Sequence, residues 1–360
     1  MNEKKPFWRT KIFYSLLLAV LTCLYLGMLL AFHVRRDEKT PPSEAISQFQ
    51  SAEKNWQQRM GNEKAMEAYM TEHPVEGAIF NLFALLFIGA FILGIVFDFM
   101  LILKRDLRQR LIRDGPADPV EWGMGMLCRV VILWIILSLG LSFLFAFLKD
   151  SYFMASMNTF VILHTTIMDL VGAALIVWTV RRAKGHWRDL GFHLKFKEIF
   201  KEIGVGLFGY LCVLPIFFLI LIGLVLLARL MAYEPPPHPL VEIFLEEEKR
   251  APALIGYSIF LGSIAGPILE ELFFRGFCYP ILRRNWGTKL ALVLTALFFA
   301  FIHQNEFAFI PIFILGIGLG LLYETRKNLI APITMHIVHN CFFMAYFFAA
   351  KHMILSANAG

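Results

Sequence analysis

The feature that most constrains this chain is a series of long apolar segments separated by short polar connections. A helix needs about 20 mostly apolar residues to cross the hydrocarbon core of a bilayer. By that criterion we mark nine candidate spans: Ile12–Phe32, Ala78–Leu103, Met124–Leu148, Tyr152–Val180, Val205–Met231, Ala253–Leu282, Lys289–Ile302, Phe307–Tyr323 and Leu329–Ala350. The seventh and eighth are short, so they form either two spans or a tilted, partly re-entrant hairpin.

The composition supports the same class of protein. The chain is 58% hydrophobic and 17% charged, whereas soluble domains are about 45–50% apolar and about 25% charged. We therefore predict an all-α fold, a polytopic transmembrane helix bundle of about eight or nine spans. The five cysteines form no C-x-x-C pair, which favours free thiols over disulfides or zinc ligands.

The net charge of +6 indicates membrane topology and contact with lipid headgroups, because the basic residues flank apolar segments. We expect no binding of nucleic acid. If the N-terminus lies inside, the inner segments hold 21 of the 34 Lys and Arg residues and the outer segments hold 11. This predicts an integral, multi-pass protein with a cytoplasmic N-terminus, in the plasma or inner membrane if the organism is prokaryotic. The first span then acts as a retained signal anchor.

Two polar segments between spans have helical patterns. The long loop 33–77 places apolar residues on one face around Trp56 and on another around Tyr69, which predicts a helical hairpin outside the membrane. The segment Leu194–Gly204 alternates Lys and Glu with Phe and Ile, which predicts a separate amphipathic helix at the membrane interface.

The sixth span contains Glu270, Glu271 and Arg275. An ionisable group inside a span costs about 2.5–3.5 kcal/mol and usually marks a function or a paired contact. These three side chains should therefore face the bundle interior or a wet cavity. Glu271 and Arg275 are four residues apart and can pair on a helix, whereas Glu270 points about 100° away and is the candidate general base.

Histidine and asparagine side chains occur in later spans. The seventh span ends in His303, and the ninth holds His336, His339 and Asn340. A carboxylate, two imidazoles and an amide are the groups needed to activate water and to stabilise an oxyanion. Each motif alone has a structural alternative, namely a solvated helix face, a packing histidine or a helix-bridging asparagine. Their joint presence within apolar spans favours an active site in an intramembrane cavity.

Other polar and small residues within spans are predicted to be structural. Asp98 can pair with Arg129 near the inner ends of their spans. Asp169 and His164 either line a proton path or serve in packing or a hydrogen bond between helices, and we favour the structural interpretation. Gly316 and Gly320 form a G-x-x-x-G pattern, which allows close approach of helices.

At these residues the sequence resembles the CPBP family of CAAX proteases and bacteriocin-processing enzymes, also called type II CAAX prenyl endopeptidases. The family pattern reads here as Glu270-Glu271-x-x-x-Arg275, Phe299-x-x-x-His303 and His336-x-x-x-Asn340. The resemblance covers residues 256–347. It divides the chain into an N-terminal membrane region, 1–200, and a CPBP-like catalytic bundle, 201–360.

The resemblance implies an intramembrane endopeptidase in which Glu270 and His303 activate water. It also implies that His336 and Asn340 stabilise the oxyanion, and that Glu271 and Arg275 orient their helix, with Phe299 in support. The implied partner is a membrane-tethered peptide or protein, either a CAAX-type prenylated tail or a leader or regulator peptide.

A metal is the main alternative in the chemistry. Glu270, His303 and His336 would also make a zinc site with Glu271 as base. The local H-E-x-x-H signature is missing, and we favour a metal-free mechanism with no cofactor.

Two other functions remain open from the sequence. A proton- or ion-coupled transporter would use the same buried acids and histidines as a relay, but the two halves show no inverted repeat. A non-catalytic scaffold or immunity protein would use the fold to hold a partner.

Overall fold

The computed structural model describes residues 44–111, 120–148, 157–192, 195–233, 239–248 and 250–357, with four isolated positions before residue 44. The described residues are helical and contain no strand. The α-helices are α2 (Glu44–Met60), α3 (Glu63–Glu72), α4 (Pro74–Leu103), α5 (Arg105–Leu111), α6 (Met124–Leu148), α7 (Met157–Arg182), α8 (Phe196–Leu230), α9 (Pro239–Glu247), α10 (Pro252–Phe260), α11 (Gly266–Glu271), α12 (Tyr279–Ile302), α13 (Phe309–Arg326) and α14 (Ile330–Ser356). Three shorter segments are the 3₁₀ turn η2 (Trp187–Leu190) and the π-helices η3 (Leu261–Ala265) and η4 (Leu272–Cys278).

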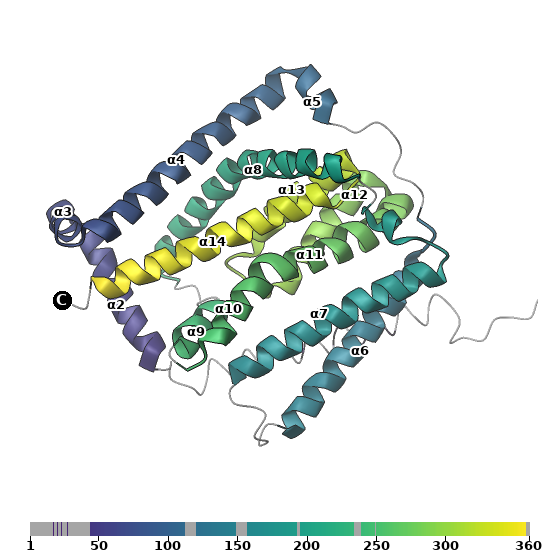
Figure 1. The fold of residues 1–360 in the computed structure, drawn as a ribbon, viewed down its shortest axis with the longest axis horizontal. Helices are drawn as coiled ribbons and strands as arrows, with labels where there is room; N and C mark the ends of the chain where they lie inside the picture. Colours follow the sequence, from purple (N-terminus) through teal and green to yellow (C-terminus); the bar gives the residue numbers. More distant parts are fainter. Residues whose placement is uncertain are drawn as a thin grey trace, which may run out of the picture.

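The long helices lie roughly side by side (Figure 1). Helix α14 packs between α8 and the helix that runs from α10 through η4, and α13 packs on α12 and α8. Helix α4 covers the outer side of α8, and the α6–α7 pair flanks α11 and η4 from the opposite side. A core of Tyr210, Leu214, Phe274, Phe299, Leu315, Leu319 and Met335 joins α8, η4, α12, α13 and α14.

Seven helices of the described part are long and apolar enough to cross a membrane. They confirm a polytopic helical bundle, and α6 has the bounds expected from the sequence. The predicted span Ile12–Phe32 falls outside the described residues except at isolated positions. The sixth and seventh predicted spans are two helices that meet end to end within the stretch Pro252–Ile302, of 51 residues. Gly287 interrupts the stretch with a φ of 81° and a ψ of 167°, a backbone conformation that residues other than glycine rarely adopt.

Helix α8 corrects one prediction from the sequence. The segment Leu194–Gly204 was expected to be a separate interfacial helix, but Phe196 begins a 35-residue helix that continues through the span. Glu202 turns inwards and is buried, and its carboxylate binds Arg326 of α13, with 2.8 Å between Arg326 Nε and Glu202 Oε2. The ion pair with Arg326 therefore holds the first turns of α8 against α13.

The predicted helical hairpin is present as α2 and α3. Trp56 and Tyr69 meet edge to face at 5.1 Å between ring centroids. The Tyr69 hydroxyl lies 2.8 Å from Ser356 Oγ and 3.3 Å from the Met353 carbonyl oxygen. The hairpin thus packs on the end of α14, and its position outside the membrane stays a prediction.

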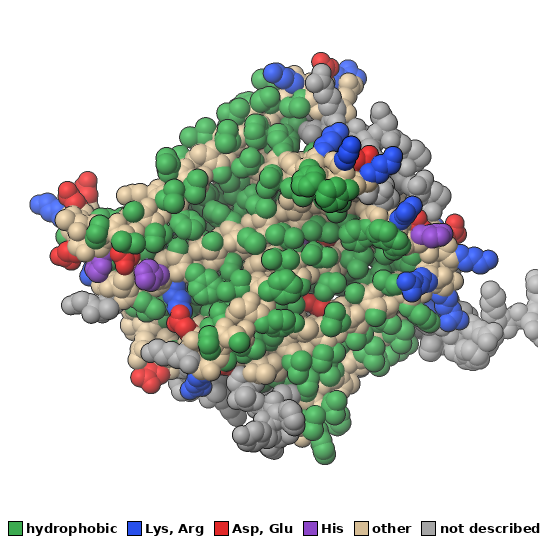
Figure 2. Space-filling view, in the orientation of Figure 1, with side chains coloured by type: hydrophobic (Ala, Val, Ile, Leu, Met, Phe, Trp, Pro, Cys, Tyr) green, Lys and Arg blue, Asp and Glu red, His purple; other side chains and the backbone are tan. Residues whose placement is uncertain are grey.

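The surface has a basic end and an apolar belt. Figure 2 shows Lys and Arg side chains gathered at the end where α5, η2 and the start of α8 lie, and apolar side chains over the long helices. This end contains the segments that the count of Lys and Arg residues predicts to lie on the inner side of the membrane. The orientation itself stays a prediction.

The Glu202–Arg326 ion pair provides a test of the fold. We expect Glu202→Gln to lower the free energy of unfolding by about 3–5 kcal/mol, because it leaves a buried guanidinium without its counter-charge. Denaturant unfolding in detergent micelles measures this change. The control is Lys201→Gln, an exposed neighbour on the same helix, which should change stability by less than about 0.5 kcal/mol. Equal stability of the two variants would contradict the inward position of Glu202.

Candidate active site

The two glutamates lie on a short α-helical segment between two π-helices. Residues Gly266–Glu271 of α11 follow η3 and precede η4. In η3 the Gly266 amide donates to the Leu261 carbonyl, five residues back, and Pro267 has no amide hydrogen to donate. π-Helical turns are rare and occur frequently at functional sites. The π-turns therefore mark α11 as a specialised part of the bundle.

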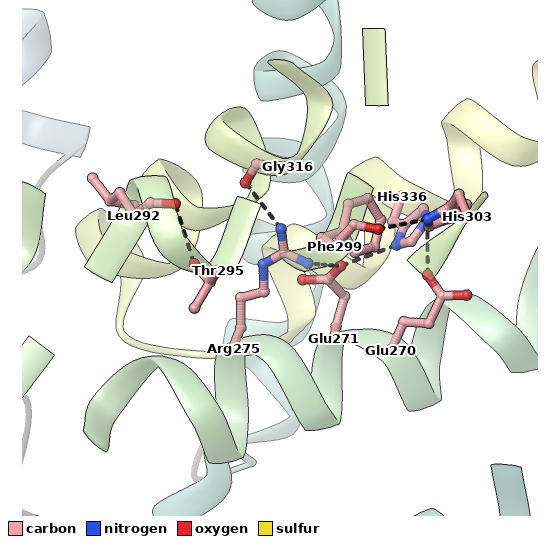
Figure 3. A network of polar contacts seen from close by, with 9 residues as sticks. All are labelled: Glu270, Glu271, Arg275, Leu292, Thr295, Phe299, His303, Gly316 and His336. Carbon is pink, nitrogen blue, oxygen red and sulfur yellow. Dashed lines mark hydrogen bonds and ion pairs between the residues drawn. The ribbon is translucent and has the colours of Figure 1, made fainter. Parts of the chain in front are cut away.

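Glu271, Arg275 and His336 form a buried chain of polar contacts (Figure 3). Arg275 Nη1 donates to Glu271 Oε1 at 2.8 Å, and His336 Nδ1 lies 3.0 Å from the same oxygen. The side chains of Glu271 and Arg275 are fully buried, and that of His336 is 2% exposed. Arg275 Nη2 also donates to the Gly316 carbonyl at 2.9 Å. The chain thus joins α11, η4, α13 and α14.

This arrangement confirms the expected pairing of Glu271 with Arg275 and adds a partner. The family resemblance implied that the pair orients its own helix, and the structure shows that Glu271 also contacts His336 of α14. The Glu271 carboxylate accepts from His336 Nδ1. The other ring nitrogen of His336, Nε2, is on the side of Glu270.

Glu270 is the least satisfied carboxylate of the cluster. Its side chain is 30% exposed, and its Oε2 atom is buried without a hydrogen-bond partner in the protein. Oε2 lies 3.8 Å from His336 Nε2, a separation that suits a bridging water better than a direct hydrogen bond. Glu270 was expected to act with His303, and its close imidazole in the structure is His336.

His303 and His336 meet around one aromatic ring. The Phe299 ring centroid lies 4.8 Å from that of His303 and 5.5 Å from that of His336, edge to face in both cases. The guanidinium carbon of Arg275 lies 4.8 Å from the same centroid. Phe299 is fully buried, so it acts as the packing centre that fixes both imidazoles and the cation.

The tautomer of His303 follows from its contact. His303 Nδ1 lies 2.7 Å from the Phe299 carbonyl oxygen, which can only accept, so Nδ1 carries the hydrogen. In the neutral imidazole Nε2 is then an acceptor. His303 can therefore hold a water molecule by accepting one of its hydrogens.

Asn340 is already engaged with the sixth span. Its Nδ2 donates to the Gly262 carbonyl in η3 at 2.8 Å. That carbonyl needs a donor, because Gly266 N is used by Leu261 and Pro267 has no hydrogen. One amide hydrogen of Asn340 remains for another acceptor.

Small residues bring α13 close to the site. A Cβ atom on Gly316 would lie 3.1 Å from Ala296 and 3.3 Å from the Phe299 ring, and one on Gly320 would lie 2.8 Å from Leu292. The predicted G-x-x-x-G contact is thus confirmed between α12 and α13, and it carries the Gly316 carbonyl to Arg275.

Several other polar residues of the spans lie apart from this network. His164 bridges to Ser138 and Ser142 of α6, with 3.2 Å between His164 Nε2 and Ser142 Oγ, as the helix-bridging interpretation predicts. Asp98 makes a hydrogen bond with Cys212. His339 packs among the rings of Tyr210, Phe217 and Phe343.

Asp169 is the residue whose position the sequence did not reveal. It was interpreted as a packing residue of the fourth span, but it lies close enough to Glu270 for the two carboxyl groups to interact electrostatically. The only sequence signal was an acid in the middle of an apolar segment. Its contact with a residue 101 positions later depends on the packing of α7 against α11.

The zinc alternative finds no ready ligand set. Among the described residues, no group of three or more His, Cys, Asp or Glu side chains is placed to hold a metal ion. One nitrogen of His336 is directed at Glu271 and one nitrogen of His303 at a carbonyl. In both rings Nδ1 makes the contact, which leaves Nε2 for water or another ligand.

Comparison with known proteins finds similarity in the segment that carries these residues. Residues 252–342 match the model of the type II CAAX prenyl endopeptidase Rce1-like family. The chain is 35% identical over 95 residues to the membrane-embedded CAAX protease MroQ of Staphylococcus aureus strain USA300. This match covers 24% of the chain and 38% of the relative's length. No solved structure matches. The resemblance inferred from the three motifs is therefore confirmed: residues 252–342 of this chain are related to the Rce1-like type II CAAX prenyl endopeptidases.

Proposed function

We propose that the protein is an intramembrane endopeptidase that hydrolyses a peptide bond of a membrane-associated substrate. The observation that carries this proposal is the position of Glu270. It is partly exposed, lacks a hydrogen-bond partner at Oε2 and lies 3.8 Å from His336 Nε2, whereas the neighbouring Glu271 is bound through Oε1 to both Arg275 and His336. A carboxylate left free beside an imidazole is suited to remove a proton from water.

In the proposed reaction Glu270 and His303 hold the attacking water. His303 Nε2 accepts one hydrogen of the water, and Glu270 Oε2 accepts the hydrogen that is removed. The oxygen attacks the carbonyl carbon of the scissile peptide bond and forms a tetrahedral intermediate. Glu270 then gives the proton to the departing nitrogen, and the C–N bond breaks to leave an acid and an amine.

The oxyanion of that intermediate requires hydrogen-bond donors. In its protonated form, His336 donates from Nδ1 to Glu271 and presents Nε2–H to the reacting group. Asn340 offers its second amide hydrogen, since the first is bound to Gly262 O. Glu271 and Arg275 keep the His336 ring in place because they are fully buried and paired.

The proposed substrate is tethered to the membrane, because the network lies among apolar helices. The relative's name, a CAAX protease, supports a CAAX-type prenylated tail as the specific case, with leader or regulator peptides as the broader class. Membrane lipids are the second partner. We propose further that the N-terminus is cytoplasmic, that residues 1–200 with an extramembrane loop 33–77 form the N-terminal region, and that residues 201–360 form the catalytic bundle.

Replacement of the proposed base tests the mechanism. We expect Glu270→Gln to lower peptide cleavage by about 10²–10⁴-fold, the usual contribution of general acid–base catalysis, while the protein still inserts and folds. The measurement compares new peptide ends in membranes that contain either the wild type or the variant, and it names the substrate at the same time. Glu306→Gln is the matched control, because Glu306 is exposed and only three residues from His303.

The outcome also separates the competing functions. If the two sets of peptide ends are identical in wild type and Glu270→Gln, the peptidase proposal fails. Loss of ion flux without any peptide product would instead support a transporter.

His303 provides a second test. We expect His303→Ala to abolish cleavage without a large loss of stability, because its side chain makes a single hydrogen bond to Phe299 O. Cleavage assays and thermal unfolding are measured on the same purified sample. Cleavage at the wild-type rate would show that another residue holds the water.

Removal of metal ions tests the cofactor proposal. We expect full activity after exhaustive chelation and dialysis, because in the proposed mechanism Glu270 and His303 activate water without a metal ion. Activity that is lost on chelation and restored by zinc alone would contradict the metal-free mechanism.

A further inference from the structure

The π-helix η4 is held from outside the matched region. Trp122 lies in the connection before α6, and its indole Nε1 donates to the Phe277 carbonyl at 3.1 Å. The two rings stack with an interplanar angle of 15° and centroids 5.9 Å apart. Both residues are completely buried. Trp122 is therefore a fixed part of the bundle and not a residue of a mobile loop.

The turn that Trp122 contacts needs external support. In η4 the Tyr279 amide donates five residues back to Phe274, and the next residue, Pro280, has no amide hydrogen. The hydrogen-bond ladder is therefore incomplete where η4 joins α12. A proline also follows the π-turn at η3, and there Asn340 donates to Gly262 O, the carbonyl that Pro267 leaves without a donor. At η4 the Trp122 indole donates to Phe277 O, one residue beyond the carbonyls that Pro280 leaves without a donor. Each π-helix thus receives a side-chain donor from a distant segment.

Trp122 is itself held in place. Arg284 of α12 donates from Nη1 to the Val120 carbonyl at 2.8 Å and from Nη2 to the Trp122 carbonyl at 3.1 Å. On another side, Gly276 lets the backbone of Leu190 approach η4, since a Cβ there would lie 2.8 Å from Leu190 O. These contacts fix η4 against the N-terminal half of the chain.

We propose that Trp122 is a positioning residue that fixes the register of η4 and, through it, the Arg275–Glu271–His336 chain. Phe277 lies two residues after Arg275, so a shift of the turn moves the guanidinium away from Glu271 and the Gly316 carbonyl. The consequence for catalysis rests on the proposed peptidase function. The consequence for the structure of η4 does not.

The test compares two tryptophan variants with the same chemical change. Trp122→Phe removes the hydrogen bond to Phe277 O and keeps an aromatic ring. Trp134→Phe is the matched control, because the indole of Trp134 also donates to a backbone carbonyl, Met168 O, at 3.0 Å, between α6 and α7. If the Trp122 hydrogen bond only stabilised the fold, both variants would lose folded protein to a similar extent and would otherwise behave alike.

Two measurements are made on the folded fraction of each variant. Hydrogen exchange of the peptide that contains Leu272–Cys278 should become at least about threefold faster in Trp122→Phe and stay unchanged in Trp134→Phe. With the peptide that the wild type cleaves fastest, kcat of Trp122→Phe should fall about tenfold while KM stays within about twofold. Unchanged exchange or unchanged kcat in Trp122→Phe overturns the proposal.

The design separates this proposal from the proposed function. If the wild type cleaves no peptide, the proposed function fails, and hydrogen exchange still decides whether Trp122 holds η4. If Trp122→Phe does not fold, Arg284→Gln takes its place, because it removes the two hydrogen bonds that seat the Trp122 segment. Exchange at the wild-type rate in Arg284→Gln then overturns the proposal.

Discussion

The burial of Glu271 and Arg275 among apolar helices is the constraint on which the rest of the structure depends. Both side chains are fully buried, and an unpaired charge at that depth would be strongly destabilising. Their pairing requires α13 to bring the Gly316 carbonyl and α14 to bring His336 to the same place. One electrostatic requirement thus fixes the relative positions of the helices that carry the site. It engages Glu271 through Oε1 and leaves Glu270 partly exposed, with no hydrogen-bond partner at Oε2.

The N-terminal half contributes to the site although it lies outside the matched residues. Asp169 interacts electrostatically with Glu270, and Trp122 holds the turn after Arg275. Residues from both halves share one hydrophobic core around η4, in which Trp122 and Leu190 pack with Phe277 and Leu329. In a relative with a different N-terminal region, other side chains would therefore surround the same motif residues. Such a difference could change which substrates fit the site.

The sequence predicted those features that depend on one segment at a time. Apolar length gave the bounds of α6, and helical spacing gave the Glu271–Arg275 pair and the α2–α3 hairpin. It did not predict features that depend on contacts between distant segments. The inward turn of Glu202 requires Arg326, and the π-turns around α11 receive side-chain donors from Asn340 and Trp122. Pro267 was visible in the sequence, but a proline indicates a missing donor and not the residue that compensates for it, here Asn340.

The central claim is that Glu270 activates water for direct attack on a peptide bond. Cleavage of the identified substrate in ¹⁸O-labelled water by the purified protein tests this most directly. The account predicts that each new C-terminal carboxyl group carries one ¹⁸O atom with the wild type, and that Glu270→Gln produces no labelled product above the uncatalysed level. Labelled product formed at the same rate by both proteins would contradict it.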